Sequence, residues 1–220
     1  MLLYPLGLSL AVAASATLLS LGVAVPIAAI LARKRFFGRD LVDAIVCLPL
    51  VLPPTVLGYY LLVLLSRGSL LGRAFTALFG GPLTFTPAAA VVAAMVHALP
   101  YIIKSGRAAL EDVDPLLLRT AASLGAGPLR SLWTVELPQC RRQLLAATLL
   151  AFARSLGDFG VTLMIAGDIP GYTQTASLAI YDAVQAGRDA DALGLVAVLS
   201  AISLGVLYIG NKLTPAAHER

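Results

Sequence analysis

The 25 residues from Leu8 to Ala32 read LSLAVAASATLLSLGVAVPIAAILA and contain no charged side chain. A bilayer core is about 30 Å thick, and an α-helix crosses it with roughly 20 apolar residues. Three further uncharged runs are long enough to do this, at residues 44–66, 83–103 and 192–211. A fifth run, 143–167, contains Arg154 and Asp158 but is apolar on either side of them. The sequence therefore predicts about five membrane-spanning segments.

The composition excludes a water-soluble globular protein. Hydrophobic residues make up 59% of the 220 residues and charged residues 13%, and the mean hydropathy is +0.87. So small a polar fraction cannot cover the surface of a soluble domain. The apolar runs have helical periodicity, with Pro and Gly at their ends and without the alternation of strands. We therefore expect an all-α integral membrane bundle, forming a single domain over residues 1–220.

Lys and Arg residues in the connections predict the orientation of this bundle. The segment RKRFFGRD at 33–40 has four of them, the connection 104–142 has six and the tail from Lys212 has two, which makes twelve on one side. The opposite side has three, which are Arg67, Arg73 and Arg188. Because short cytoplasmic loops carry the excess of basic residues, the N-terminus is expected outside and the C-terminus in the cytoplasm. The formal charge of +4 then reflects topology, and no nucleic-acid partner is expected.

The connection 104–142 is the only polar segment of the sequence that is large enough to hold structure of its own. Within it, Asp114 and Pro115 are typical of the start of a helix, and Gly125 is typical of a helix end. A second short helix is expected after that glycine, and Pro138 is expected to stop it. The sequence thus predicts a short helix, a glycine turn and a second short helix on the cytoplasmic face.

An apolar patch at helical spacing lies on the second of these helices, at Leu129, Leu132 and Trp133. Two interpretations of this patch stay open from the residues alone. In the first, the helix rests on lipid headgroups, as interfacial amphipathic helices do. In the second, a soluble partner docks on the patch.

This segment resembles a loop of ABC importer permeases with the pattern Glu-Ala-Ala, three residues, Gly, nine residues, Ile-x-Leu-Pro. The resemblance runs through Gly125, Val135, Leu137 and Pro138. The family's Glu falls on Arg119 and its two Ala on Thr120 and Ala121, so only Ala121 agrees with that part. The resemblance implies a bundle like that of a type I ABC importer permease, in which the loop forms a coupling helix that docks on a separate ATPase. The coupling residues implied are Arg119, Thr120, Ala121, Gly125, Ala126, Leu129, Leu132, Trp133, Leu137 and Pro138.

Two other stretches are similar to molybdate permeases. They are LPLVLPPTVLGYYLLVLL at 48–65 and LAFARSLGDFGVTLMIAGDIPGYTQT at 150–175, followed by LAIY at 178–181. The resemblance implies ATP-driven import of molybdate or tungstate by alternating access, with this chain as the membrane subunit. Sulfate permeases share the Phe-Ala-Arg-x-Leu-Gly pattern, so a sulfate or thiosulfate importer is the alternative.

Prolines interrupt the run 44–66 at Pro49, Pro53 and Pro54. Each removes a backbone donor and clashes with the preceding turn, so this span is expected to kink or open. The break is either a packing kink or part of a gate, in which freed carbonyls, Thr55 and Gly58 line the substrate path, as in the broken helices of transporters.

Three ionisable residues fall within predicted spans, and a charge at that depth is costly unless it is paired or faces water. Arg154 and Asp158 are four residues apart, so they share a helix face and are expected to neutralise each other. Alternatively, Arg154 offers guanidinium donors to a departing dianion while Asp158 orients it. His97 is either a neutral histidine bonded to a backbone carbonyl or a substrate contact. With neither Cys nor carboxylate at ligand spacing around His97, we expect no metal site.

The outward connection from residue 167 to 191 contains a Pro170-Gly171 turn and an uncharged run, 169–181, that is too short to span. It is either a lid over the bundle or, as the resemblance implies, a surface on which a substrate-loaded binding protein docks. The docking residues named on that basis are Asp168, Pro170, Gly171, Thr173 and Thr175.

The sequence lacks the phosphate-binding pattern G-x-x-x-x-G-K-[ST], so we expect ATP and Mg²⁺ to bind a partner ATPase and this chain to be non-catalytic, without a cofactor of its own. Five spans are few for a complete pathway, so a homodimer is expected beside the ATPase pair and an extracellular or periplasmic oxyanion-binding protein. The location implied is a bacterial or archaeal cytoplasmic (inner) membrane. The alternatives are a channel or a secondary transporter, although the latter would usually show internal repeats and intramembrane carboxylates, and here only Asp158 lies deep in a predicted span.

Overall fold

The computed structural model describes residues 3–34 and 36–213, and over these residues every regular element is a helix. In chain order they are α1 (Leu3–Arg33), α2 (Arg39–Val51), α3 (Pro54–Leu65), α4 (Leu70–Phe79), α5 (Pro87–Glu111), α6 (Pro115–Ser123), α7 (Pro128–Ser131), the π-helix η1 (Leu132–Glu136), α8 (Leu137–Leu156), α9 (Gly160–Ala166), α10 (Ala176–Gln185) and α11 (Asp189–Leu213). This agrees with the all-α class expected from the sequence.

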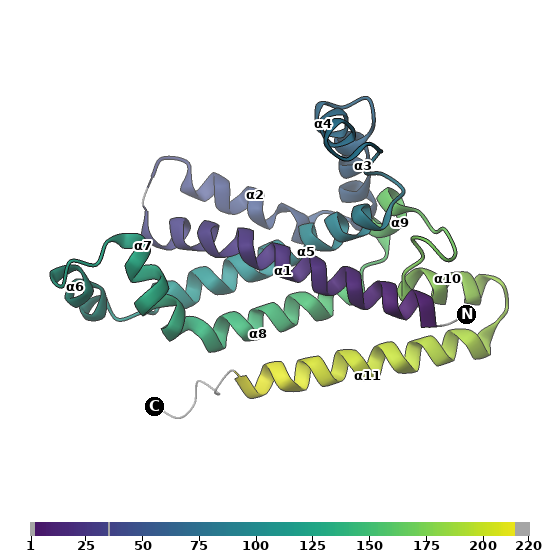
Figure 1. The fold of residues 1–220 in the computed structure, drawn as a ribbon. Helices are drawn as coiled ribbons and strands as arrows, with labels where there is room; N and C mark the ends of the chain where they lie inside the picture. Colours follow the sequence, from purple (N-terminus) through teal and green to yellow (C-terminus); the bar gives the residue numbers. More distant parts are fainter. Residues whose placement is uncertain (1–2, 35, 214–220) are drawn as a thin grey trace.

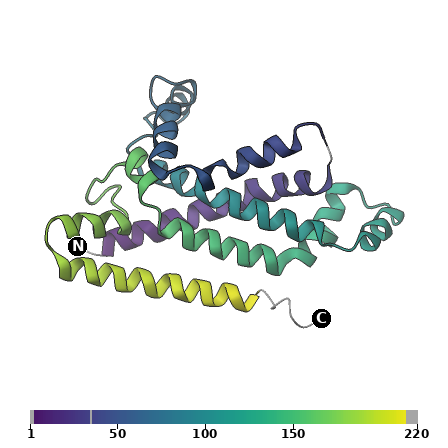
Figure 2. The same cartoon turned by 180° about the vertical axis from the view of Figure 1, so that it is seen from behind.

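The long helices α1, α5, α8 and α11 lie side by side along one axis (Figures 1 and 2). Helix α1 packs on α5 and α8, and α11 packs on α8 and α10. The short helices α6 and α7 lie at one end of this bundle, while α3, α4, α9 and α10 gather toward the other end. The end with α6 and α7 is also where α1 finishes at Arg33 and α5 at Glu111, so it carries most of the basic connections.

Three helices, α1, α5 and α11, are long and apolar enough to cross a membrane. Two bent pairs bring the possible spans to five, since α2 and α3 meet at 114° and the helix 128–156 meets α9 at 63°. The first of these breaks falls where Leu52 and Pro53 adopt extended backbone. Because Pro53 and Pro54 have no N–H to donate, the ladder of helix bonds cannot continue through them.

Helix α5 extends to Glu111, eight residues beyond the uncharged run that ends at Ile103. The extension is stabilised by ion pairs, from Lys104 to Asp43 at 2.7 Å and from Arg107 to Glu111 at 2.9 Å. Helix α5 thus occupies the first part of the predicted connection 104–142. The segment that links α5 to α8 covers only residues 112–136.

Small side chains form much of the buried core. Helix α5 contributes five fully buried alanines, at positions 89, 90, 93, 94 and 98, and α1 contributes Ala13, Ala16 and Ala24. In a membrane, small residues let helix backbones approach closely, so packing contacts and hydrogen bonds can form between them. One such bond joins Ser20 Oγ on α1 to the carbonyl of Met95 on α5 at 3.4 Å.

Candidate functional site

The linking segment 112–136 folds from local turn chemistry. The Asp114 carboxylate caps α6 by accepting from the Leu116 N–H at 2.8 Å, with Pro115 at the first helical position. At the other end, Gly125 has φ +80° and its N–H bonds to the Ala122 carbonyl at 3.0 Å. The next N–H bonds back to the carbonyl of Ala121 at 2.9 Å. These two backbone hydrogen bonds end the helix and require one residue in a left-handed backbone conformation, which glycine adopts without strain.

Helix α6 is the outermost element at its end of the bundle (Figure 1). It exposes leucine side chains at Leu116 (66% exposed) and Leu117 (41%), and Leu124 follows it at 82%. The sequence analysis did not name these leucines. The signal was the run Leu116–Leu118 on a nine-residue helix, because three consecutive apolar residues cannot all face one neighbour. They form an apolar tip that a partner can cover.

The three residues of the predicted patch, Leu129, Leu132 and Trp133, line one groove but differ in exposure. Leu132 is only 7% exposed and packs in a cluster with residues of α1, α5 and α8. Leu129 and Trp133 are 69% and 64% exposed, and they line an apolar groove along the side of the bundle. The patch therefore faces the side of the bundle, with Leu132 as its most buried member, while α6 forms the tip.

The expectation that Pro138 stops the second short helix was wrong. The chain runs on from α7 through the π-helix η1 into α8, with Pro138 in the first turn of α8. The N–H of Leu137 bonds to the carbonyl of Leu132, five residues back, as a π-helix requires. This wider turn changes the bonding register immediately before the proline, whose ring would clash with the carbonyl four residues earlier in a regular helix. The linking segment is therefore continuous with a membrane helix.

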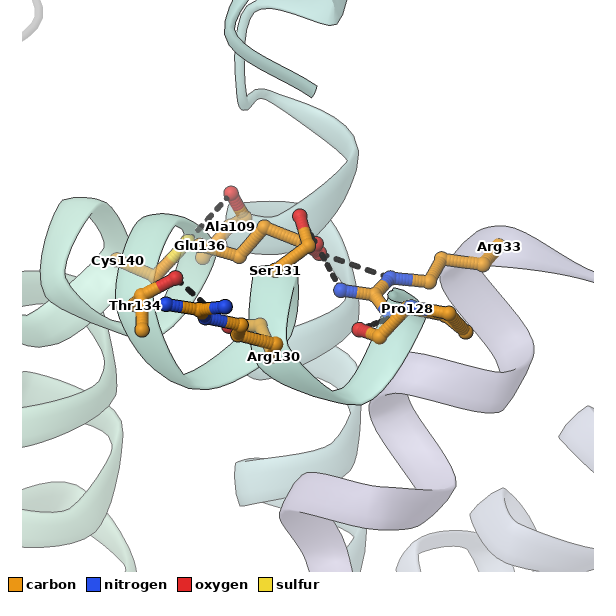
Figure 3. Close-up of polar contacts among 8 residues, drawn as sticks. All are labelled: Arg33, Ala109, Pro128, Arg130, Ser131, Thr134, Glu136 and Cys140. Carbon is orange, nitrogen blue, oxygen red and sulfur yellow. Dashed lines mark hydrogen bonds and ion pairs between the residues drawn. The ribbon is translucent and has the colours of Figure 1, made fainter. Parts of the chain in front are cut away.

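A buried ion pair joins this segment to α1 (Figure 3). Arg33 donates through Nε to Glu136 Oε2 at 2.9 Å and pairs through Nη2 with Glu136 Oε1. Its Nη1 also donates to the Pro128 carbonyl at 3.0 Å, and Ser131 Oγ donates to Glu136 Oε1 at 3.3 Å. Glu136 is 2% exposed, so nearly all of its acceptor capacity is used within the protein. Sequence analysis missed this pair because its members are 103 positions apart.

At the break between α8 and α9, Asp158 pairs with a different residue from the one expected. Its Oδ1 lies 3.1 Å from His97 Nδ1 on α5, and its Oδ2 accepts from the Thr162 hydroxyl at 2.5 Å and the Thr162 N–H at 3.2 Å. The two side chains are both almost fully buried, so they face each other away from solvent. His97 thus faces a carboxylate rather than the backbone carbonyl that sequence analysis offered.

The structure does not show the predicted ion pair between Arg154 and Asp158. Within the described residues, no Arg154 nitrogen comes within ion-pair distance of an acidic side chain, although its charge still acts on Asp158 from farther away. Asp158 lies beyond the end of α8 at Leu156, so the two no longer share one helix face. Arg154 itself is half-buried on α8.

The proline-rich break has two environments. Pro53, Pro54 and Thr55 are exposed, whereas Gly58 is buried. A Cβ on Gly58 would lie 2.7 Å from Met164 Cβ, and one on Gly160 would lie 2.7 Å from Pro54 Cβ. The two broken spans therefore pack together, α3 on α9, through glycines that admit no side chain. Of the residues suggested for the substrate path, the structure brings His97 and Asp158 together, and the role of the set stays a prediction.

Part of the connection 167–191 is buried in the bundle. Thr173 and Thr175 are buried, and Thr173 Oγ donates to the Gly167 carbonyl at 3.2 Å, so these side chains are not available to a docking protein in this conformation. Pro170 and Gly171 are exposed. Burial raises the pKa of the Asp168 carboxyl above its ordinary value, a bond from Gln174 opposes the rise, and the charge of Asp182 adds to it.

A helical membrane bundle with an exposed apolar tip at one end and two broken helices is the architecture expected of the membrane subunit of a transporter. The chain belongs to the family described as the binding-protein-dependent transport system inner membrane component, whose model matches residues 24–211. It is therefore a multi-pass inner-membrane protein, and the resemblance to ABC importer permeases is confirmed.

Two molybdenum transport system permease proteins, both named ModB, are similar over most of the chain. The protein from Escherichia coli K12 is 39% identical over 97% of this chain and 93% of its own length. The protein from Haemophilus influenzae is 42% identical over 82% of this chain and 79% of its own. The sulfate transport system permease protein CysT of Salmonella typhimurium is 36% identical over 84% of this chain and 66% of its own.

Solved structures confirm the fold. A chain of a bacterial alginate ABC transporter superposes with a TM-score of 0.75 at 15% identity, over 99% of this chain and 79% of that chain. A chain of the MetNI methionine ABC transporter in an inward-facing form gives 0.73 at 18% identity, over 98% of this chain and 97% of that one. The bundle is thus that of an importer permease.

Proposed function

We propose that this chain is the membrane subunit of an ATP-driven importer of molybdate, with tungstate taking the same path. The observation that carries the substrate assignment is the similarity to molybdenum permeases over as much as 97% of the chain, including both broken spans. The sulfate permease is a second candidate, because it too is 36% identical to this chain. Molybdate, tungstate and sulfate are all tetrahedral dianions, so both candidate functions need the same kind of transport path.

The geometry of the linking segment supports a coupling role. Helix α6 offers an apolar tip, and the chain continues from Pro128 to Leu156 into the break at Asp158. A displacement of the tip would therefore move α8 and its junction with α9, and the Arg33–Glu136 pair would carry the same displacement to α1. Interfaces of this kind switch between discrete packings, as alternating access requires.

In this proposal the end carrying α6 and Arg33 faces the cytoplasm, with the N-terminus outside. Two copies of the chain enclose the pathway, each bound to one subunit of an ATPase pair that holds ATP and Mg²⁺. A binding protein delivers the oxyanion to the opposite end, where Pro170 and Gly171 are exposed. This chain would then perform no catalysis of its own.

Arg154 is the group best suited to meet the dianion. Its guanidinium is half-buried within a span and is not held by a neighbouring carboxylate. A planar cation with several donors suits a tetrahedral oxyanion, and it would release its ligand more readily than a closed site. Pro53 and Thr55, which are exposed, would line the path at the break between α2 and α3.

Reconstitution tests the proposal directly. The purified chain is combined in proteoliposomes with its ATPase and its binding protein, and ATP hydrolysis and uptake are measured with molybdate, tungstate, sulfate or no ligand. Stimulation by molybdate and tungstate but not by sulfate supports the proposal. Stimulation by sulfate alone would assign the chain to the second candidate, and failure to assemble with the ATPase would contradict the coupling role.

Gly125→Ala is expected to reduce uptake several-fold. Its φ of +80° costs a side-chain-bearing residue about 1–2 kcal/mol, although its Cβ would meet nothing within 4 Å. Gly127→Ala is the matched control, because Gly127 has φ −67° and equally open space, so its uptake should be normal. Uptake in proteoliposomes, normalised to the protein inserted, measures both. Equal uptake by the two variants would contradict a role for the turn in positioning α6.

A further inference from the structure

An apolar groove lies on the side of the bundle between α1 and α8, and α7 and η1 close it at one end. Its volume is about 650 Å³. On α1 its lining includes Leu18, Leu21 and Val25, and on the linking segment 112–136 it includes Leu129 and Trp133. The groove is also lined by four residues that the resemblance implies for coupling, which are Leu129, Leu132, Trp133 and Leu137, whereas the exposed leucines of α6 do not line it.

The groove has one charged group in its lining, Arg141 on α8. Arg141 is exposed, and it makes no ion pair within the part of the chain that the structure describes. Its nearest basic neighbour in sequence, Arg142, does not line the groove. An apolar groove with one unpaired cation suits a ligand that has a hydrocarbon tail and an anionic headgroup.

The depth of the groove fits one leaflet of the membrane. On α1 the groove runs from Leu18, near the middle of the helix, to Pro26, and these eight residues correspond to about 12 Å along the axis. The groove therefore extends from the middle of the span toward the end where α6 and α7 lie. Trp133 stands at that end, at the level where tryptophan is enriched at membrane interfaces.

We propose that this groove binds an anionic glycerophospholipid from the leaflet on the Arg33 side, with an acyl chain along α1 and the phosphate on Arg141. Basic pockets between transmembrane helices on the cytoplasmic side bind anionic headgroups in this way. The lipid contacts Leu129 and Trp133, which belong to the segment anchored by Glu136, so its presence supports the position of that segment. The proposal concerns lipid binding and does not depend on which oxyanion is carried.

Trp133 is the only tryptophan in the chain, so its fluorescence reports directly on the groove. The full chain is placed in phosphatidylcholine vesicles that contain a minor fraction of brominated phosphatidylglycerol or, in a parallel sample, of brominated phosphatidylcholine. We expect apparent binding to be about fivefold stronger for phosphatidylglycerol, the ratio that one basic residue supplies at an anionic surface. Equal quenching by the two lipids, or quenching by neither, would overturn the proposal.

Two pairs of variants make the test specific. Arg141→Gln should abolish the preference for phosphatidylglycerol, while Arg142→Gln should keep it. Gly22→Leu should weaken quenching by both lipids, because Gly22 lines the groove and the leucine side chain would fill it. A Cβ at Gly22 meets nothing within 4 Å, so the substitution introduces no clash there. Gly7→Leu, equally open but at the other end of α1, should have no effect. A preference that survives Arg141→Gln would refute the assignment of the headgroup.

Discussion

Replacing Arg33 with glutamine is expected to lower the free energy of unfolding by about 3 kcal/mol, at the lower end of the range for breaking a buried ion pair. Glu136 is 2% exposed, so water cannot replace the guanidinium that its carboxylate loses. The lower end applies because the Arg33 side chain is itself 27% exposed. Unfolding of the purified chain in detergent, followed by circular dichroism as denaturant is added, measures the loss.

The double variant Arg33→Gln, Glu136→Gln should recover much of that stability, because it removes the buried charge together with its partner. Lys104→Gln is the matched control. Its pair with Asp43 has a distance of 2.7 Å, but the two side chains are 46% and 21% exposed, so the loss should stay below about 1 kcal/mol. The buried-pair interpretation fails if Arg33→Gln and Lys104→Gln cost the same, or if the double variant is no more stable than Arg33→Gln.

The same double variant separates folding from coupling. With both charges removed, the ion pair no longer connects α1 to the linking segment 112–136, although Leu132 still packs against α1. We expect reconstituted complexes to hydrolyse more ATP for each oxyanion imported than the wild type. An unchanged ratio of hydrolysis to uptake would show that α1 is not moved through this contact.

Asp158→Ala is expected to lower the free energy of unfolding by about 3–5 kcal/mol and to abolish uptake. The substitution leaves the Thr162 hydroxyl and N–H without their acceptor and removes the charge beside His97, all in a region where Asp158 is 4% exposed. Asp158→Asn should lose less stability, because its amide oxygen can still accept from Thr162. Denaturant unfolding and proteoliposome uptake are the two measurements.

Arg154→Gln serves as the control for Asp158→Ala. Because Arg154 is not ion-paired with Asp158, its removal should change stability by less than about 1 kcal/mol, while uptake falls because the path loses its cation. If the two residues were a structural pair, Arg154→Gln would destabilise the chain strongly and the double variant Arg154→Gln, Asp158→Asn would restore it. That outcome would contradict the geometry described here.

Local sequence signals predicted much of the architecture. Asp114 and Gly125 specify the two ends of α6, and both act as expected, because capping and a left-handed turn depend on residues within one or two turns of the chain. Pro53 and Pro54 mark the break between α2 and α3 for the same reason. Pro138 does not end a helix as expected, because the preceding π-turn changes the bonding register where a proline would otherwise clash.

The sequence alone determined that the chain is a helical membrane bundle, where prolines break it and where α6 begins and ends. Run length and turn chemistry are local, so one chain is enough to define them. Only the tertiary structure decided which charges meet: Arg33 with Glu136 across 103 positions, and His97 with Asp158 rather than Arg154 with Asp158. Those pairs depend on how the helices are rotated and aligned against one another, and that alignment is set by the packing of small residues in the whole bundle.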